Sequence, residues 1–273
     1  MAIITISRGT FSGGNALADR LAERLGYPKL GREEAILEAT KDYGISVDKL
    51  TAAVKNPPSI WQQALGPRIA YLKCLTATIL EHAQNGNLVY HGYAGHLLLT
   101  GISHLFRVRV IADMEFRIQA AMKQTNLKRE EAIDYIGKVD KERSRWTYFL
   151  YGLEWQDPAL YDLVLNLENM TLDDACEIIG CRIKLDDFKR TPESQKSFED
   201  SLLSSRVWAS LAKDARTRIA SIQVIADSGA GVVTLTGSLG SKKTLDAIVE
   251  TAGQVKGVKS VINQLGLGTD WYW

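Results

Sequence analysis

The segment from Gly9 to Ala16 has the residue types and spacing of a phosphate-binding loop. It reads GTFSGGNA, and Gly9 and Gly14 keep the spacing G-x-x-x-x-G between an apolar run and an amphipathic one. Glycines let the backbone curl so that successive amides point at phosphate oxygens, and a following helix adds partial positive charge at its N-terminus. The segment therefore predicts phosphate binding.

Two positions of this loop lack the side chains that phosphoryl transfer uses. Asn15 stands where a lysine would reach the β- and γ-phosphates, and Ala16 stands where a hydroxyl would ligate Mg²⁺. Each loss is expected to cost about 2 to 4 kcal/mol of transition-state stabilisation, by analogy with removing one preorganised donor. An alternative is that Gly9, Gly13 and Gly14 only make a tight strand-to-helix connection.

The elements around the loop indicate how it is positioned. Ile3 to Ile6 form an apolar run typical of a strand, and Leu17, Leu21 and Leu25 lie on one helical face. Further apolar runs, separated by helical stretches, are Leu88 to Tyr90, Val108 to Ala112 and Leu163 to Leu167. This alternation predicts an α/β fold in which helices flank a parallel sheet and ligands bind at the C-terminal ends of the strands.

A change of composition divides the chain. The charged, Pro-containing stretch KLDDFKRTPESQK predicts a linker at 186–197, between a first domain at 1–185 and a second at 198–268. An aromatic tail follows at 269–273. The second domain is expected as a small α-β-β-α-β unit with helices at about 198–219 and 244–255 and strands at 222–226, 232–236 and 258–267.

Composition excludes several classes of protein. The 273 residues include 33 Lys plus Arg and 32 Asp plus Glu, so no whole-chain attraction to nucleic acid is expected. The 3 cysteines show no CxxC spacing and support neither a disulfide framework nor a zinc site. No export signal is visible at the start, and a cytoplasmic location is expected. The uncharged stretch 84–106 is interpreted as buried core.

A family resemblance rests on segments that follow one another along the first domain. They read ITISRGTFSGGNALADRLAERLG, LVYHGYAGHLL, ADMEFRI, KVDKERSRW and YDLVLN. Together they resemble the cytidylate kinase-like family of P-loop nucleoside monophosphate kinases, over about residues 1 to 182. The resemblance implies a parallel sheet of five strands with a monophosphate-binding arm and a mobile lid. It also implies transfer of the γ-phosphoryl group of ATP to CMP or a similar monophosphate, with Mg²⁺.

The same resemblance implies roles for individual residues near the nucleotide. Arg117 would lie near the donor nucleotide, and the lid residues Lys141, Arg143 and Arg145 would surround the transferred phosphoryl group with positive charge. An alternative for the segment KERSR is a solvated helix face with Glu142 as counter-charge. The residues implied to cradle the phosphates are Ser7, Arg8, Gly9, Thr10, Phe11, Ser12, Gly13, Gly14, Asn15 and Ala16.

Other positions carry weaker expectations. Arg32 and Arg68 are candidate ligands of the acceptor phosphate, and surface solvation explains either equally well. Asp113 is a candidate Mg²⁺ ligand, with a helix N-cap as the alternative that we favour. His91 and His96 lack metal-ligand partners in sequence and are interpreted as packed or loop residues.

The chain also departs from the family pattern. Many relatives carry a basic residue where Asn15 stands, an Asp near Gly31, and an Arg where Tyr93 stands. Each departure removes a nucleotide contact. These losses favour an alternative hypothesis, in which the chain is a non-catalytic nucleotide sensor or assembly module.

The second domain has a resemblance of its own. The segment VVTLTGSLGSKKTLDAIVETAGQVKGVKSVINQLGLG resembles the BON domain, over about residues 198 to 268. This implies binding of phospholipid or of a protein partner, and a membrane-surface adaptor is a third hypothesis. The terminal aromatics Trp271 to Trp273 would dock a bilayer or a partner, or pack on their own domain or on a neighbouring subunit. Homo-oligomerisation is therefore left open.

Overall fold

The structure is a computed structural model that describes residues 2–55, 65–92, 94–217 and 222–268. The chain forms two units. The first contains the described residues of the ranges 1–34, 54–57 and 82–190, and the second contains those of 35–53, 58–81 and 191–273. The sequence pattern did not indicate that residues 35–53 and 58–81 would group with the C-terminal part of the chain.

The first unit contains a parallel sheet with the strand order β2-β3-β1-β4-β5. Its elements in chain order are β1 (Ile3–Arg8), α1 (Gly14–Leu25), β2 (Lys29–Gly31), β3 (Leu88–His91), α5 (Gly95–Leu98), β4 (Leu105–Ile111), α6 (Met114–Thr125), α7 (Arg129–Tyr151), η1 (Pro158–Leu160), β5 (Leu163–Asn166), α8 (Leu172–Arg182) and η2 (Asp186–Phe188). The predicted parallel sheet flanked by helices is therefore confirmed. β2, a strand of three residues, had not been predicted.

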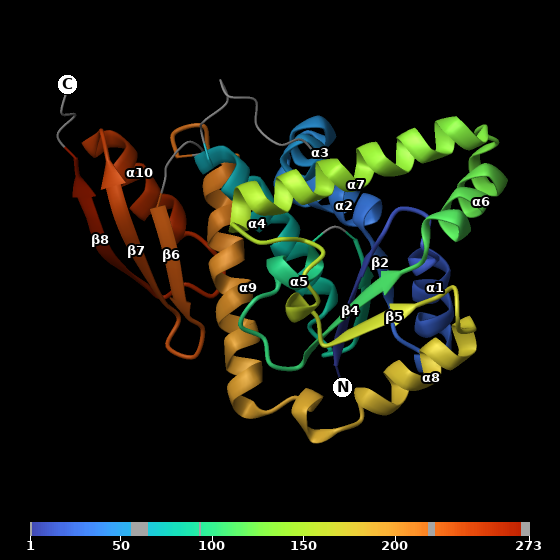
Figure 1. The fold of residues 1–273 in the computed structure, drawn as a ribbon. Helices are drawn as coiled ribbons and strands as arrows, with labels where there is room; N and C mark the ends of the chain where they lie inside the picture. Colours follow the sequence, from blue (N-terminus) through green and yellow to red (C-terminus); the bar gives the residue numbers. More distant parts are fainter. Residues whose placement is uncertain (1, 56–64, 93, 218–221, 269–273) are drawn as a thin grey trace. The chain divides into compact units, whose positions relative to one another are not determined.

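The hydrophobic pattern explains why these elements form one core. β1 has the adjacent Ile3 and Ile4 fully buried, as expected of a strand covered on both faces. Leu17 and Leu21 of α1 are fully buried and pack into the same cluster as Ile179 of α8, so α1 and α8 lie side by side against the sheet (Figure 1). β1 lies between β3 and β4, which places its C-terminal end at the middle of the sheet edge.

The second unit contains three helices that come before β3 in the chain, two C-terminal helices and a separate small sheet. The helices are α2 (Arg32–Tyr43), which begins in the first unit, and α3 (Val47–Lys55) and α4 (Leu65–His82), whose last residues are counted in the first unit. The C-terminal elements are α9 (Pro192–Lys213), β6 (Ile222–Asp227), β7 (Val232–Leu239), α10 (Lys242–Gly253) and β8 (Ser260–Leu267). β7 pairs antiparallel with β6 and parallel with β8, which gives the predicted α-β-β-α-β order.

One boundary differs from the sequence expectation. The helix expected from Phe198 begins at Pro192, inside the stretch 186–197 expected as a linker. The Thr191 side chain accepts a hydrogen bond from the Ser194 backbone N–H, and Pro192 occupies a first-turn position where its missing N–H costs nothing. Charged residues near this start mark an exposed first turn of α9 instead of a break.

The uncharged stretch 84–106 forms buried structure. It contains β3, α5 and the beginning of β4, with Leu88, Val89 and Phe106 fully buried. No helix within the described part of the chain is long and apolar enough to cross a membrane.

Adjacent isoleucines on α8 test the core assignment. Ile179 is fully buried, whereas Ile178 is 40% exposed. Ile179→Ala should lower the free energy of unfolding by about 2 to 5 kcal/mol, because it leaves a cavity beside α1. Ile178→Ala, the matched control on the same helix, should change it by less than about 1 kcal/mol. Urea unfolding of the full chain measures both values, and equal losses would contradict the packing of α8 on α1.

Candidate functional site

The junction of β1 and α1 forms the predicted curled loop. Phe11 has φ 61° and Gly13 has φ 89°, so the chain turns through left-handed conformations twice before α1 begins. The fully buried Ser12 holds the turn, because its Oγ donates to the Gly9 carbonyl at 2.9 Å and lies 3.2 Å from the Val110 carbonyl. Among the residues that the structure describes, no side chain caps the start of α1. Its first amides are therefore available to an anion.

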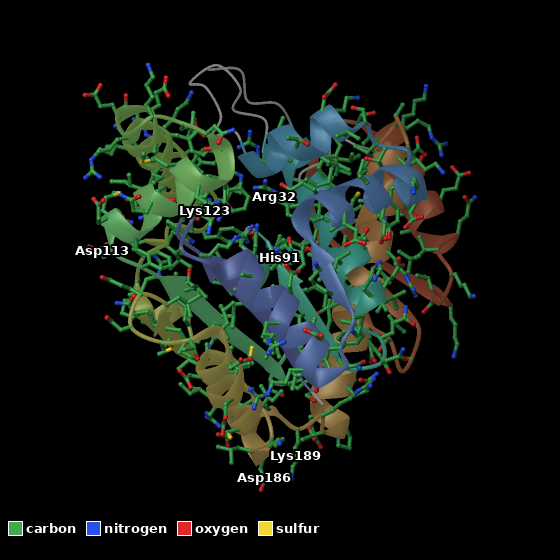
Figure 2. All side chains as sticks on the ribbon, turned by 90° about the vertical axis from the view of Figure 1, so that its right-hand side faces the viewer. Arg32, His91, Asp113, Lys123, Asp186 and Lys189 are labelled. Atoms are coloured by element: carbon green, nitrogen blue, oxygen red, sulfur yellow. The ribbon has the colours of Figure 1, made fainter. Side chains whose placement is uncertain are left out.

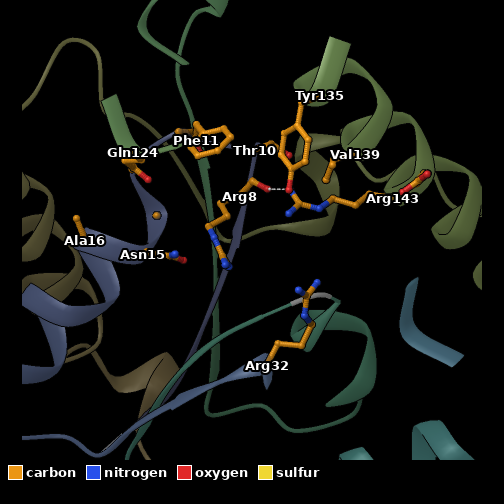
Figure 3. Close-up of a pocket in the computed structure, with 14 residues that line it drawn as sticks. Arg8, Thr10, Phe11, Asn15, Ala16, Arg32, Gln124, Tyr135, Val139 and Arg143 are labelled. Carbon is orange, nitrogen blue, oxygen red and sulfur yellow. Dashed lines mark hydrogen bonds between the residues drawn. The ribbon is translucent and has the colours of Figure 1, made fainter. Parts of the chain in front are cut away.

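A cavity of about 410 Å³ opens over this loop (Figure 3). The loop forms one wall, Arg32 contributes from the start of α2, and α6 and α7 provide the rest. Its described lining residues are Arg8, Thr10, Phe11, Ser12, Gly13, Gly14, Asn15, Ala16, Arg32, Gln124, Tyr135, Val139, Glu142 and Arg143. The C-terminal end of a central parallel strand is where α/β proteins bind ligands, so this cavity is the candidate site.

Positive charge dominates the described lining of the cavity. Arg8, Arg32 and Arg143 face it, and Glu142 is the single carboxylate among the described lining residues. Burial, together with the charges of Arg143 and Arg32, lowers the pKa of Arg8 to about 10. Arg8 therefore stays protonated at neutral pH, and like charges held this close favour a bound anion.

The carboxylate of Asp140 on α7 holds the loop from behind. It accepts hydrogen bonds from the Thr10 backbone N–H at 3.2 Å and from the Thr10 Oγ1 at 2.7 Å, and it pairs with Arg117 of α6. Arg117 also donates through Nε to the Thr10 carbonyl at 2.7 Å. These contacts connect the loop to both helices. Sequence reasoning missed Asp140, although it lies in the quoted segment KVDKERSRW three positions before Arg143.

Arg143 joins this arrangement from the cavity side. Its Nη1 donates to the Arg8 carbonyl at 2.8 Å and lies 3.5 Å from an Asp140 oxygen, with 15% of its side chain exposed (Figure 3). Arg143 is thus fixed at the mouth of β1. Among the three predicted lid cations, Arg143 is the one that belongs to the described lining residues of the cavity.

Two aromatic residues, Trp155 and Tyr161, pack beside Ser7 near the C-terminal end of β1. The Trp155 indole donates to the Ser7 Oγ at 3.0 Å, and the Tyr161 hydroxyl donates to the Trp155 carbonyl at 2.9 Å. The guanidinium of buried Arg109 lies 4.4 Å from the centre of the Trp155 ring, and that of Arg143 lies 5.6 Å from it. Cation–π contact stabilises both charges, and Arg143 also lies 3.5 Å from an Asp140 oxygen. Sequence patterns did not indicate Trp155, Tyr161 or Arg109, because the contacts that bring them together with Ser7 join residues far apart in the chain.

Several predicted residues lie elsewhere. Lys141 and Arg145 are exposed on α7 and do not line the cavity, which fits the alternative of a solvated helix face. Arg117 packs behind the loop, with its guanidinium carbon 3.5 Å from the place of a Cβ on Gly9, so it does not line the cavity either. Arg68 lies on α4, which belongs to the second unit. Tyr93 lies outside the described residues.

The candidate Mg²⁺ ligands do not form a metal site. Asp113 is exposed at the surface (Figure 2) and caps α6 by accepting from the Phe116 backbone N–H at 2.9 Å. Ala16 offers no side-chain oxygen, and the described residues contain no group of three or more His, Cys, Asp or Glu that could hold a metal ion. The residues present therefore do not fit a protein-held Mg²⁺ ion.

The two histidines are packed residues. His91 ends β3, and burial lowers its pKa to about 4, helped by the charge of Arg8. His96 is 3% exposed and its ring centre lies 4.7 Å from that of Tyr161; burial lowers its pKa to about 3. Both are neutral at pH 7, as their interpretation as packed residues implies.

Comparison with known proteins agrees with this geometry. A cytidylate kinase of Staphylothermus marinus is 23% identical over 180 residues, which cover 66% of this chain and 94% of the relative. A cytidylate kinase of Ignicoccus hospitalis is 24% identical over 181 residues, covering 66% of this chain and 97% of the relative. An uncharacterized protein from Eubacterium ventriosum has a similar fold, with a TM-score of 0.52, 18% identity, and coverage of 67% of this chain and 99% of that one.

Family models divide the chain where the elements do. A BON domain model matches residues 199–268, which contain the α-β-β-α-β elements of the second unit. The cytidylate kinase-like family model matches residues 3–169, from β1 to just past β5, and so spans the sheet, the loop and the cavity. On the strength of that match, this chain belongs to the cytidylate kinase-like family.

Proposed function

We propose that the first unit binds a nucleoside triphosphate in the cavity and slowly transfers its γ-phosphoryl group to a nucleoside monophosphate such as CMP. The observation that carries this proposal is an α1 N-terminus without a side-chain cap, facing a cavity with three arginines and one described carboxylate. The cytidylate kinases among its relatives support a pyrimidine monophosphate as the acceptor.

The chain's own residues would act mainly by binding and by neutralising charge. The loop amides and the α1 N-terminus hold the phosphate chain, while Arg143 lies at the mouth of β1 where charge develops. In the transfer step the bond from the γ-phosphorus to its bridging oxygen breaks, and an acceptor phosphate oxygen forms the new bond. Tyr135 and Val139 of α7 cover the cavity and limit the access of water.

A non-catalytic nucleotide sensor is the second candidate. The observation that favours it is the absence of a side-chain oxygen at Ala16 and of an amine at Asn15, both of which line the cavity. A sensor needs phosphate binding but no stabilisation of the transition state. Turnover therefore separates the two candidates.

A further binding function of the BON region, residues 199–268, stays a prediction. Its sheet has one face covered by helices, with Leu235 fully buried, and one face that carries Ile225 and Ile262 on either side of Thr234. These isoleucines are 59% and 47% exposed. A protein partner or a phospholipid surface would fit such a face. The cytoplasmic location also stays a prediction.

Calorimetric titration followed by an assay for ADP tests the proposal. We expect the full chain to bind ATP in the presence of Mg²⁺ and to form ADP when CMP is added. The rate should be about a thousandfold or more below that of an enzyme whose loop carries the lysine and the hydroxyl that are absent here. Binding without CMP-dependent ADP would support the sensor instead. Failure to bind ATP would contradict both candidates.

Neighbouring arginines on α7 test the role of the cavity. Arg143→Met should lower turnover about 10- to 100-fold, because it removes a charged donor at the mouth of β1. Arg145→Met is the matched control, since Arg145 is exposed on the same helix and does not line the cavity. It should leave turnover within about twofold of the unchanged chain. Equal losses of the steady-state rate in the two variants would contradict a specific role for the arginine that lines the cavity.

A further inference from the structure

The loop lacks a lysine, yet a long cationic side chain reaches the same cavity from the preceding strand. Arg8 is the last residue of β1, and its side chain lines the cavity together with Asn15. Figure 3 shows its guanidinium directed into the space between Asn15 and Arg32. A charge therefore lies beside the position from which a loop lysine would have extended.

Gly14 makes this approach sterically possible. A Cβ at position 14 would lie 2.6 Å from the Arg8 Cδ and 2.8 Å from the Arg8 Cβ, closer than atoms can approach. Gly14 begins α1 without a left-handed φ, so space and not backbone conformation requires glycine there. The Arg8 side chain thus passes the start of α1 through space that any side chain at position 14 would fill.

Among the described residues, the charge of Arg8 has no ionic partner. Within the described residues, no ion pair joins its guanidinium to a carboxylate, and Glu33 offsets the repulsion by Arg143 and Arg32 only in part. By contrast, Arg32 pairs with Glu33, and Arg143 lies 3.5 Å from Asp140. A half-buried guanidinium among other guanidiniums is a site for an anion with several oxygens, since its planar fork binds two of them at once.

We propose that Arg8 supplies, from the strand, the cation that the loop lacks at Asn15, and that it binds the terminal phosphates of a triphosphate together with Arg32 and Arg143. This inference rests on the proposed nucleotide binding and adds the group that recognises the phosphate chain. The ligand class is a linear polyphosphate ester, whose charge is spread over more oxygens than a monophosphate offers.

Removal of the charge tests the assignment. Arg8→Met keeps an apolar side chain over Gly14 and retains the backbone carbonyl that accepts from Arg143. Calorimetry with ATP and with inorganic tripolyphosphate should show binding weakened about 10- to 100-fold. Arg20→Met is the control, because Arg20 lies on the exposed surface of α1 and pairs with Asp173. It should leave both affinities within about twofold.

A lysine at position 15 provides the decisive comparison. If Arg8 serves the same phosphates, Asn15→Lys should restore most of the lost affinity to the Arg8→Met chain, yet change the unaltered chain by less than about threefold. A gain of about tenfold or more from Asn15→Lys alone would overturn the proposal, because that position would then be unserved. The measurement on Asn15→Lys alone does not depend on whether Arg8→Met folds.

The outcomes separate this inference from the proposed function. If the unaltered chain binds neither ATP nor tripolyphosphate, the proposed function fails. If it binds both and Arg8→Met, with an unchanged circular dichroism spectrum, binds them equally well, nucleotide binding stands and the role of Arg8 is wrong.

Discussion

One carboxylate, that of Asp140, fixes the relation between the phosphate loop and the helices around it. It binds the backbone and side chain of Thr10 while pairing with Arg117 and approaching Arg143. With 15% of its side chain exposed, little water competes for these bonds. Ser12 holds the turn of the loop, and the contact with Asp140 connects that loop to α6, α7 and Arg143. Loss of the carboxylate would remove the ionic partner that Asp140 offers to the partly buried Arg117 and Arg143, although both would still donate to backbone carbonyls.

The site separates negative from positive charge across the thickness of the loop. Asp140 contacts the loop through Thr10 and is not among the described lining residues, whereas Arg8, Arg32 and Arg143 line the cavity together with the one carboxylate of Glu142. Buried Arg109 is stabilised by the rings of Trp155 and Tyr161, whose centres lie 4.4 and 5.4 Å from it. Aromatic faces stabilise a cation without adding an anion that would repel phosphate. The cavity therefore keeps its positive potential.

Local patterns predicted the parts of this fold that local chemistry determines. The strand before Gly9 and the helix after Gly14 followed from apolar periodicity and glycine spacing. β2 was not predicted, because Lys29–Gly31 is too short to show a hydrophobic period. It is a strand only through its pairing with β3. Asp140 could not be assigned because its partner Thr10 is 130 positions away. Helix periodicity also could not say which α7 cation faces the cavity, since the orientation of α7 is set by tertiary packing.

The arginines around the cavity also connect folding to the ionic surroundings. Burial, together with the charges of Arg143 and Arg32, lowers the pKa of Arg8 in the folded chain, and this unfavourable contribution disappears when the chain unfolds and the charges separate. Any multivalent anion that binds only the folded form adds to stability according to its concentration and affinity. Inorganic phosphate or sulfate in the buffer would thus raise the melting temperature where chloride at the same ionic strength would not. Thermal stabilities of variants in this cluster are comparable only when the buffer anion is held constant.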